Sequence, residues 1–319
     1  MSVESPWNPA DRDDCDIDVA YLGPRGTFTE QAATALAPAR GTTVPALTIQ
    51  DTLAMVLSGR AHTAVVPFEN SVEGSVSVTL DALIHGAPLV IVAEAHVAVR
   101  FAILANEGFS LAQIRRVATH PHAAAQARGW LAANLPDAEV LPETSTARAA
   151  ELVASGVYDA AIASTLAAPR FGLHVLTDDI SDRPGAVTRF VQLSRPTAPP
   201  ALTGADTTTL VAFLSRNHPG ALLQLLEQFA TRGVDLTRLE SRPTGEALGQ
   251  YCFAIEANGH ISEPRMAEAL TGLRRSCADV RYFGSYPRAD GAEHPVSAQA
   301  SETAYVHARE WVASLTRGD

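Results

Sequence analysis

The sequence contains no lysine, so all 24 of its basic residues are arginine. This absence excludes a Schiff-base lysine, and with it pyridoxal phosphate chemistry. It also removes the lysine of a Walker A loop, which argues against P-loop nucleotide hydrolysis. The three cysteines, Cys15, Cys252 and Cys277, are spaced like neither a zinc site nor a disulfide framework. We therefore expect no metal site.

Long apolar runs are also missing. The most apolar stretch, residues 87–105, is interrupted by Glu94, His96 and Arg100, which is typical of buried strands and not of a membrane span. The polar, acidic first 16 residues do not resemble a signal peptide. A net charge of −11 argues against nucleic acid or an acidic membrane as the main partner, although a pocket can still attract a small anion. We expect a cytoplasmic protein.

The first two thirds of the chain alternate short apolar runs with amphipathic ones. Residues 17–22 and 63–68 predict strands, and residues 121–135 predict one helix with proline in its first turn. Such alternation is typical of an α/β fold with largely parallel sheets. Residues 17–198 are numerous enough for two such lobes with a cleft between them.

A second pattern follows a linker rich in proline, threonine and glycine at residues 194–206. It predicts strand, helix, strand, strand, helix and strand, the ferredoxin-like βαββαβ order, within about 85 residues. A small linked domain of this kind suggests regulation or assembly. The tail ends in a weakly amphipathic stretch at residues 304–315, which could pack on this domain or form a dimer contact.

Polar side chains follow several predicted strands, where sites of α/β proteins form. Residues 23–30 join a strand to a helix through glycines whose N–H groups can face an anion, but a tight turn capped by Thr27 explains them equally well. After the strand at 63–68, Glu69, Asn70 and Ser71 are consecutive. Three polar residues exceed what one helix cap needs, which favours a functional role.

Two further segments carry candidate residues. His120 precedes a predicted helix, where a packed or capping role is favoured over substrate binding. Ser145 and Thr146 begin the next helix and can offer donors to a carboxylate. Arg189, between Thr188 and Phe190, can hold a carboxylate through two parallel bonds, although a surface ion pair is the common alternative. The combined pattern predicts an anion-binding cleft joined to a sensor domain.

In order and spacing, these segments resemble the prephenate dehydratase family, and the C-terminal part resembles an ACT domain. The resemblance covers residues from about 17 to 290. The catalytic-region motifs are Gly26-Thr27-Phe28, Pro67-Phe68-Glu69-Asn70-Ser71, His120-Pro121, Ser145-Thr146-Ala147 and Thr188-Arg189-Phe190. The two motifs similar to phenylalanine-binding segments are Asn217-His218-Pro219-Gly220-Ala221-Leu222 and Leu239-Glu240-Ser241-Arg242-Pro243.

The resemblance implies a two-lobed catalytic region like periplasmic binding proteins at residues 17–198 and a ferredoxin-like ACT domain at 205–288, with extensions at 1–16 and 289–319. It implies conversion of prephenate to phenylpyruvate, water and carbon dioxide in phenylalanine biosynthesis, without a cofactor. Phenylalanine is the expected allosteric effector, bound between the ACT domains of a homodimer or homotetramer. The short segment before the first strand leaves no room for a chorismate mutase domain.

The resemblance also implies roles for individual residues. Thr188 is the expected hydrogen-bond donor to the leaving hydroxide, with catalytic roles for Glu69, Asn70 and Ser71. The expected substrate-binding residues are Gly26, Thr27, Phe28, His120, Ser145, Thr146, Arg189 and Phe190. Arg189 has a second interpretation, in which it holds the loop beside Thr188.

Two positions depart from the family pattern. Ala186 stands where the family often has asparagine, which removes one polar contact, and His122 replaces a glutamine, a change expected to affect only the start of the helix. Three other functions stay open: a substrate-sensing protein without catalysis, an arogenate dehydratase, and an ACT scaffold.

Overall fold

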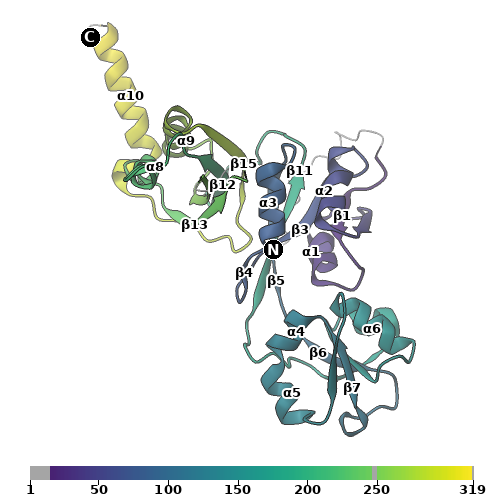
Figure 1. The fold of residues 1–319 in the computed structure, drawn as a ribbon. Coiled ribbons are helices and arrows are strands. Elements are labelled where there is room, and N and C mark those ends of the chain that lie inside the picture. Colours follow the sequence, from purple (N-terminus) through teal and green to yellow (C-terminus); the bar gives the residue numbers. More distant parts are fainter. Residues whose placement is uncertain (1–14, 246–249, 318–319) are drawn as a thin grey trace. The chain divides into compact units, whose positions relative to one another are not determined.

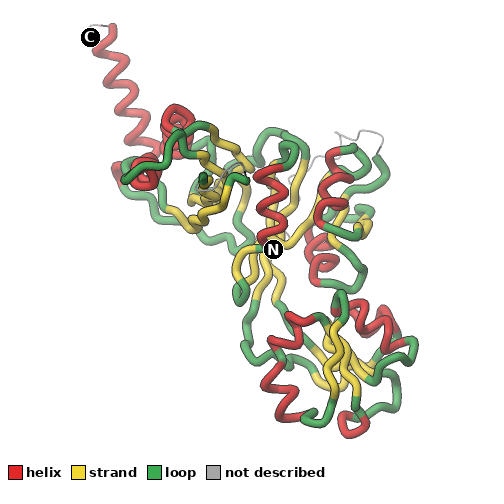
Figure 2. Tube along the Cα trace, in the orientation of Figure 1, coloured by secondary structure: helices red, strands yellow, loops and turns green. Residues whose placement is uncertain are grey.

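A computed structural model describes residues 15–245 and 250–317, so most of the predicted extension at residues 1–16 lies outside the described residues (Figure 1). The described chain forms two compact units. Unit 1 contains the described residues up to Ala82 together with Ala95–Gln192, and unit 2 contains Leu83–Glu94 together with the described residues from Leu193 onward. The helices and strands confirm the predicted α/β class (Figure 2).

The first sheet has the strand order β2-β1-β3-β11-β5, with the short β4 beside β3. Its strands are β1 (Val19–Leu22), β2 (Thr43–Ala46), β3 (Thr63–Asn70), β4 (Gly74–Ser75), β5 (Val90–Ala98) and β11 (Val187–Ser194). Its helices are α1 (Phe28–Leu36), α2 (Ile49–Leu57) and α3 (Ser77–His85). Because β3 and β11 are neighbours, this sheet brings together residues near 70 and 188 that are far apart in the sequence.

The second sheet has the order β10-β6-β9-β7-β8. Its strands are β6 (Ala102–Ala105), β7 (Arg116–Thr119), β8 (Glu139–Pro142), β9 (Ala160–Ala163) and β10 (His174–Thr177). It is mixed and not largely parallel as predicted: β7 runs parallel to β8 and β9, whereas β6 runs antiparallel to β9 and β10.

Side-chain alternation divides the core of the second sheet between its two faces. One cluster contains Ile103, Val117 and Ile162 together with Leu131 from α5 (Arg128–Asn134). The other contains the adjacent strand residues Leu104, Ala118 and Ala161, packed with Val153 from α6 (Thr146–Ala154) and with α7 (Ala167–Phe171). Because β6, β7 and β9 are covered on both faces, their central side chains are apolar on both faces and do not alternate with polar ones.

The prediction of a single helix at residues 121–135 is wrong, because the helix is interrupted at Ala127. The chain forms α4 (Pro121–Gln126) and then α5. The carboxylate of Asp182 accepts hydrogen bonds from the backbone N–H groups of Gly129 at 2.6 Å and Trp130 at 2.9 Å. A side chain from a distant loop thus satisfies N–H groups that the first turn of a helix leaves unpaired.

The main sheet of unit 2 is antiparallel, with the order β13-β14-β12-β15. Its elements in chain order are β12 (Asp206–Phe213), α8 (Ala221–Ala230), β13 (Leu236–Pro243), β14 (Tyr251–Asn258), α9 (Pro264–Ser276) and β15 (Asp279–Pro287). The predicted order of strands and helices is therefore present. Leu225, Phe229, Met266 and Leu273 of the helices form one core cluster with the sheet residues Leu210 and Ile255.

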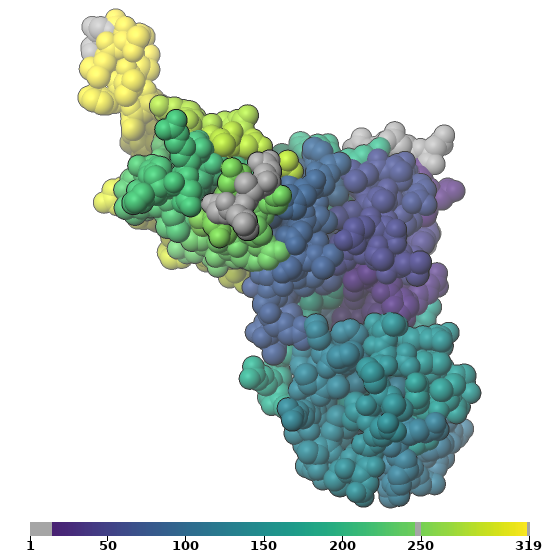
Figure 3. Space-filling view, in the orientation of Figure 1, coloured from purple at the N-terminus to yellow at the C-terminus, as the bar shows by residue number. Residues whose placement is uncertain are grey.

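The C-terminal helix α10 (Glu302–Arg317) projects from the rest of unit 2 (Figure 3). Its side chains of Trp311, Val312 and Leu315 are each more than half exposed. No helix within the described ranges combines the length and apolar character that a membrane crossing requires.

Gly284 occupies a position in unit 2 that leaves no room for a side chain. The register of β15 shifts beside Thr209, and Gly284 has a φ of +128°. A Cβ at this position would lie 2.3 Å from the carbonyl oxygen of Ile91. Both the backbone conformation and the close approach therefore require glycine.

We predict that Gly284→Ala lowers the free energy of unfolding by about 2–4 kcal/mol, because overpacking adds to backbone strain. Gly291→Ala is the matched control: its φ is +60°, but no atom lies within 4 Å of the added Cβ. The control should cost only about 1–2 kcal/mol. Urea unfolding of both variants measures the difference, and equal losses would contradict this account.

Candidate active site

Unit 1 contains a cavity of about 740 Å³. Its lining comes from strands of the first sheet and their following loops, and from the loops and helix starts that precede or follow strands of the second sheet. Its polar lining includes Asn70, His120, His122, Gln126, Ser145, Thr146 and Thr188. Its aromatic lining is Phe28, Phe101 and Phe190, and its arginines are Arg25 and Arg148. No aspartate or glutamate is among the described residues that line it. The cavity is thus basic in a chain whose net charge is −11.

A hydrogen bond joins the ends of two neighbouring strands at this cavity. The side-chain N–H of Asn70 donates to the Oγ1 of Thr188 at 2.9 Å. The Oδ1 of Asn70 accepts from the backbone N–H groups of Val72 at 2.9 Å and Glu73 at 3.1 Å, which fixes the orientation of the amide. Since its oxygen already accepts a bond, buried Thr188 keeps its own O–H to donate elsewhere.

Ser71 holds the start of β11 in register with this turn. Its backbone N–H donates to the carbonyl of Val187 at 2.9 Å, and its Oγ accepts from the N–H of Val187 at 2.9 Å. Ser71 itself is not among the described residues that line the cavity. Both of these contacts are made with the backbone of Val187, the residue before Thr188.

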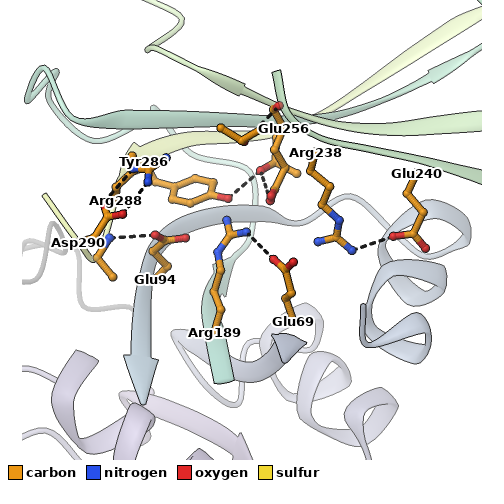
Figure 4. A network of polar contacts seen from close by, with 12 residues as sticks. Glu69, Glu94, Arg189, Arg238, Glu240, Glu256, Tyr286, Arg288 and Asp290 are labelled. Carbon is orange, nitrogen blue, oxygen red and sulfur yellow. Dashed lines mark hydrogen bonds and ion pairs between the residues drawn. The ribbon is translucent and has the colours of Figure 1, made fainter. Parts of the chain in front are cut away.

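Glu69 and Arg189 lie apart from the cavity lining. Successive residues of a strand point to opposite faces, so each is turned away from its lining neighbours Asn70 and Thr188. The guanidinium of Arg189 pairs with Glu69 at 3.5 Å (Figure 4). It also lies 5.3 Å from the ring centroid of Phe68. These contacts connect Arg189 to the neighbouring strand β3 and not to the cavity lining.

The glycine-rich turn before α1 is organised by Glu30. The N–H of Gly26 donates to the Glu30 carboxylate at 2.5 Å, and the hydroxyl of Tyr21 donates to the same group at 2.9 Å. Thr27 caps α1 by accepting from the N–H of Glu30 at 3.3 Å. Gly26 lies outside the described lining, whereas Thr27 and Phe28 belong to it.

The N-terminus of α6 opens onto the cavity. Ser145 caps the helix by accepting from the N–H of Arg148 at 3.0 Å, and Thr146 is the first helical residue. Helix N-termini attract anions through their unpaired N–H groups and the helix dipole. Arg148, which pairs with Glu151 at 2.6 Å, adds a positive charge at the same end of the helix.

Aromatic side chains form the apolar part of the lining. Phe28 and Phe101 meet edge to face with ring centroids 5.7 Å apart, and Phe190 is buried. Ala186 is buried in the apolar cluster of Val99 and Phe101, and its carbonyl accepts from the N–H of Val99 at 2.7 Å. Its backbone therefore connects β11 to the segment that enters the second sheet.

His120 and His122 bring α4 to the cavity. The Nδ1 of His120 accepts from the backbone N–H of His122 at 3.3 Å, so His120 caps α4 and its neutral ring carries the proton on Nε2. His122 lines the cavity and its ring pairs with Glu73 at 2.7 Å. The expectation that His122 affects only the start of the helix is therefore wrong, because its side chain reaches the turn after β3.

Comparisons with known proteins agree with this geometry. The prephenate dehydratase family profile matches residues 19–198. A prephenate dehydratase of Amycolatopsis methanolica is 46% identical over 302 residues, covering 94% of this chain and 98% of the relative. One of Mycolicibacterium vanbaalenii is 50% identical over 293 residues, covering 87% and 94% respectively. The chain belongs to the prephenate dehydratase family.

A solved prephenate dehydratase from Arthrobacter aurescens, in complex with L-Phe, has 45% sequence identity and a TM-score of 0.89. The match covers 94% of this chain and all of the Arthrobacter chain. Membership of the prephenate dehydratase family makes this chain an enzyme, a hydro-lyase that dehydrates and decarboxylates prephenate.

The structure adds lining residues that sequence reasoning did not single out for the family's chemistry. Gln126 and His122 lie four residues apart on α4, a spacing that places them on one helix face and could have indicated a shared role. Arg25 and Arg148 supply the positive charge that had been expected from Arg189. In the sequence, only their closeness to the candidate residues Thr27 and Ser145 indicated that Arg25 and Arg148 could belong to the site.

In unit 2, the two segments that resemble phenylalanine-binding motifs lie in different elements. Residues 217–220 form the turn before α8, where Gly220 has a φ of +90° and the N–H of Ala221 donates to the carbonyl of His218 at 3.0 Å. His218 and Ala221 line a cavity of about 180 Å³. Residues 240–243 belong to β13 and are not in its described lining. There Glu240 accepts from Arg238 at 2.9 Å (Figure 4). Glu240 also pairs with Arg242 at 3.5 Å.

The environment of His120 shifts its acidity. Burial lowers the pKa of its ring below the ordinary value of 6.5, the nearby His122 lowers it further, and Glu73 partly opposes them. We predict that an NMR titration of His120 gives a pKa below 6.5. A value at or above 6.5 would contradict this prediction.

The same shift links His120 to stability. A pKa that is lower in the folded than in the unfolded protein gives stability that is present above the unfolded value and is lost as pH falls through the folded value. The free energy of unfolding should therefore decline less on acidification in His120→Asn, which keeps a capping acceptor, than in the parent protein.

Proposed function

We propose that this chain converts prephenate to phenylpyruvate, water and carbon dioxide at the cavity of unit 1, with Thr188 as the hydrogen-bond donor to the departing hydroxyl group. The observation that carries this proposal is the bond from the oriented amide of Asn70 to the Oγ1 of Thr188 at 2.9 Å. A donor on that oxygen stabilises negative charge there, which makes the hydroxyl of Thr188 a better hydrogen-bond donor.

The barrier of the reaction lies in the leaving group. The electron pair of the bond to the departing carboxylate enters the ring, the ring becomes aromatic, and the hydroxyl group leaves with a proton as water. Since hydroxide is a poor leaving group, a donor placed at this oxygen stabilises the transition state more than the ground state. A threonine hydroxyl is a very weak acid, so Thr188 acts as a positioned donor or relay. His120, whose Nε2 carries a proton when neutral, is a further donor of the lining.

The two carboxylates of prephenate need cationic or N–H partners. We assign one to the N-terminus of α6, where Ser145 and Thr146 lie beside Arg148, and the other to Arg25 beside Thr27. Phe28, Phe101 and Phe190 provide apolar walls for the ring. Glu69, Ser71 and Arg189 then support the strand ends that carry Asn70 and Thr188, and Gly26 shapes the turn before Thr27.

Thr188→Ala should lower kcat by about a hundredfold or more, because the positioned donor is lost. Thr188→Ser, which keeps a hydroxyl, should retain most of the activity. The assay is phenylpyruvate formation from prephenate, with arogenate tested in parallel. The control is Thr34→Ala on the exposed side of α1, which should behave like the parent protein. Near-normal turnover by Thr188→Ala would contradict the assignment.

We also propose that residues 17–198 form the two-lobed catalytic domain and residues 205–288 an ACT domain that binds phenylalanine between subunits of a cytoplasmic homodimer or homotetramer. The L-Phe complex of the Arthrobacter relative supports this proposal. In one chain, His218 and Ala221 line the cavity of about 180 Å³, whereas residues 240–243 are not among its described lining. A site made from both segments therefore fits an arrangement in which two subunits contribute to it.

Phenylalanine should change the rate of phenylpyruvate formation, and Gly220→Ala should weaken this response while leaving turnover without phenylalanine intact. The reason is that a Cβ at a φ of +90° strains the turn at 217–222. Gly245→Ala, at a φ of +79° with equally open space, is the control. An unchanged phenylalanine response in Gly220→Ala would contradict the placement of the effector site.

A further inference from the structure

Glu73 lies in the turn between β3 and β4 and contacts both α4 and Asn70. The roles proposed above for the cavity residues do not account for these contacts. Its Oε2 accepts from the ring Nδ1–H of His122 at 2.7 Å, and its Oε1 accepts from the side-chain N–H of Gln126 at 3.2 Å. Each carboxylate oxygen thus has its own partner on α4. The four-residue spacing of His122 and Gln126 puts both donors on one face of that helix.

The backbone of Glu73 connects this contact to the reacting group. Its N–H donates to the Oδ1 of Asn70 at 3.1 Å, and the amide of Asn70 donates to Thr188 at 2.9 Å. A continuous path therefore runs from α4 through Glu73 and Asn70 to the hydroxyl of Thr188. Movement of the turn at Glu73 changes the orientation of the Asn70 amide, because two of its bonds are made to that turn.

Folding stability gives little reason for this contact. The side chains are 66% exposed for His122 and 37% exposed for Glu73, and ion pairs with this much exposure contribute little to stability. Electrostatics argues in the same direction. A carboxylate beside a cavity that takes a dianion opposes substrate binding, so its presence there calls for a compensating role in the reaction.

We propose that Glu73 is a positioning residue for the dehydration: held by His122 and Gln126, it fixes the turn that orients Asn70 toward Thr188. This inference rests on the proposed donor role of Thr188. It assigns His122, the residue in place of the family's glutamine, as the donor that holds Oε2 of Glu73.

The proposal predicts that loss of the Glu73 side chain lowers kcat without raising KM. Glu73→Ala should lower kcat by about tenfold or more, since a small misplacement of a catalytic group is costly. KM for prephenate should stay unchanged or fall, because a negative charge near the dianion is removed. A merely structural role would instead raise KM, lower kcat and lower the melting temperature together. The melting temperature should stay within about 3 °C of the parent value.

Matched variants test the individual contacts. His122→Gln keeps an N–H donor and should retain kcat within about threefold, whereas His122→Ala should resemble Glu73→Ala. The double variant of Glu73→Ala and His122→Ala should be no slower than Glu73→Ala, because both changes break the same contact. Arg274→Ala, which removes an exposed ion pair to Asp279 in unit 2, is the control and should leave kcat unchanged.

The outcomes separate this inference from the function on which it rests. Parent-like kcat in Glu73→Ala with an inactive Thr188→Ala would overturn the role of Glu73 alone. A raised KM or an unfolded Glu73→Ala would show a structural role and would also overturn it. Full activity in Thr188→Ala would overturn the donor role of Thr188 and with it the premise. Low kcat with an unchanged or lower KM in Glu73→Ala, together with parent-like kcat in Arg274→Ala, supports the proposal.

Discussion

The hydrogen bond from Asn70 to Thr188 is the contact on which the organisation of the candidate active site depends. It joins the end of β3 to the start of β11, two strands that are adjacent in the sheet although 118 residues separate the two side chains. Both partners are held independently: the turn at 72–73 orients the amide, and Ser71 fixes the backbone just before Thr188. A threonine has little acidity of its own, so its use as a donor requires such a preorganised setting.

The charge at the cavity is opposite in sign to the net charge of the chain. The chain carries a net charge of −11, yet the described lining of the cavity contains Arg25, Arg148 and two histidines and no carboxylate. The N-termini of α1 and α6 add partial positive charge without adding a titratable group. A dianionic substrate therefore meets a favourable local field, while the acidic exterior serves other needs, such as solubility.

Local sequence rules predicted much of this arrangement. Threonine, histidine and serine before amphipathic runs are the caps of α1, α4 and α6. Of the polar residues that follow apolar strands, Asn70 and His120 line the cavity, whereas Glu69 and Ser71 do not. The period-two alternation of strands also contained information that the prediction did not use. It turns Glu69 and Arg189 away from the face that carries Asn70 and Thr188.

What local rules could not predict are the contacts made over long sequence distances. The break between α4 and α5 depends on Asp182, which lies 53 residues after Gly129. The role of His122 depends on Glu73, in a turn of the other sheet. In each case the deciding partner belongs to an element that only the tertiary fold brings near.

A kinetic double-mutant cycle on Asn70 and Thr188 tests the central claim most directly. The single variants Asn70→Ala and Thr188→Ala and the double variant are compared by kcat for phenylpyruvate formation from prephenate. If Asn70 acts through Thr188, the double variant is no slower than the slower single variant, because the amide has no function without the hydroxyl that it orients. Additive losses would show that the two side chains act independently and would contradict the account.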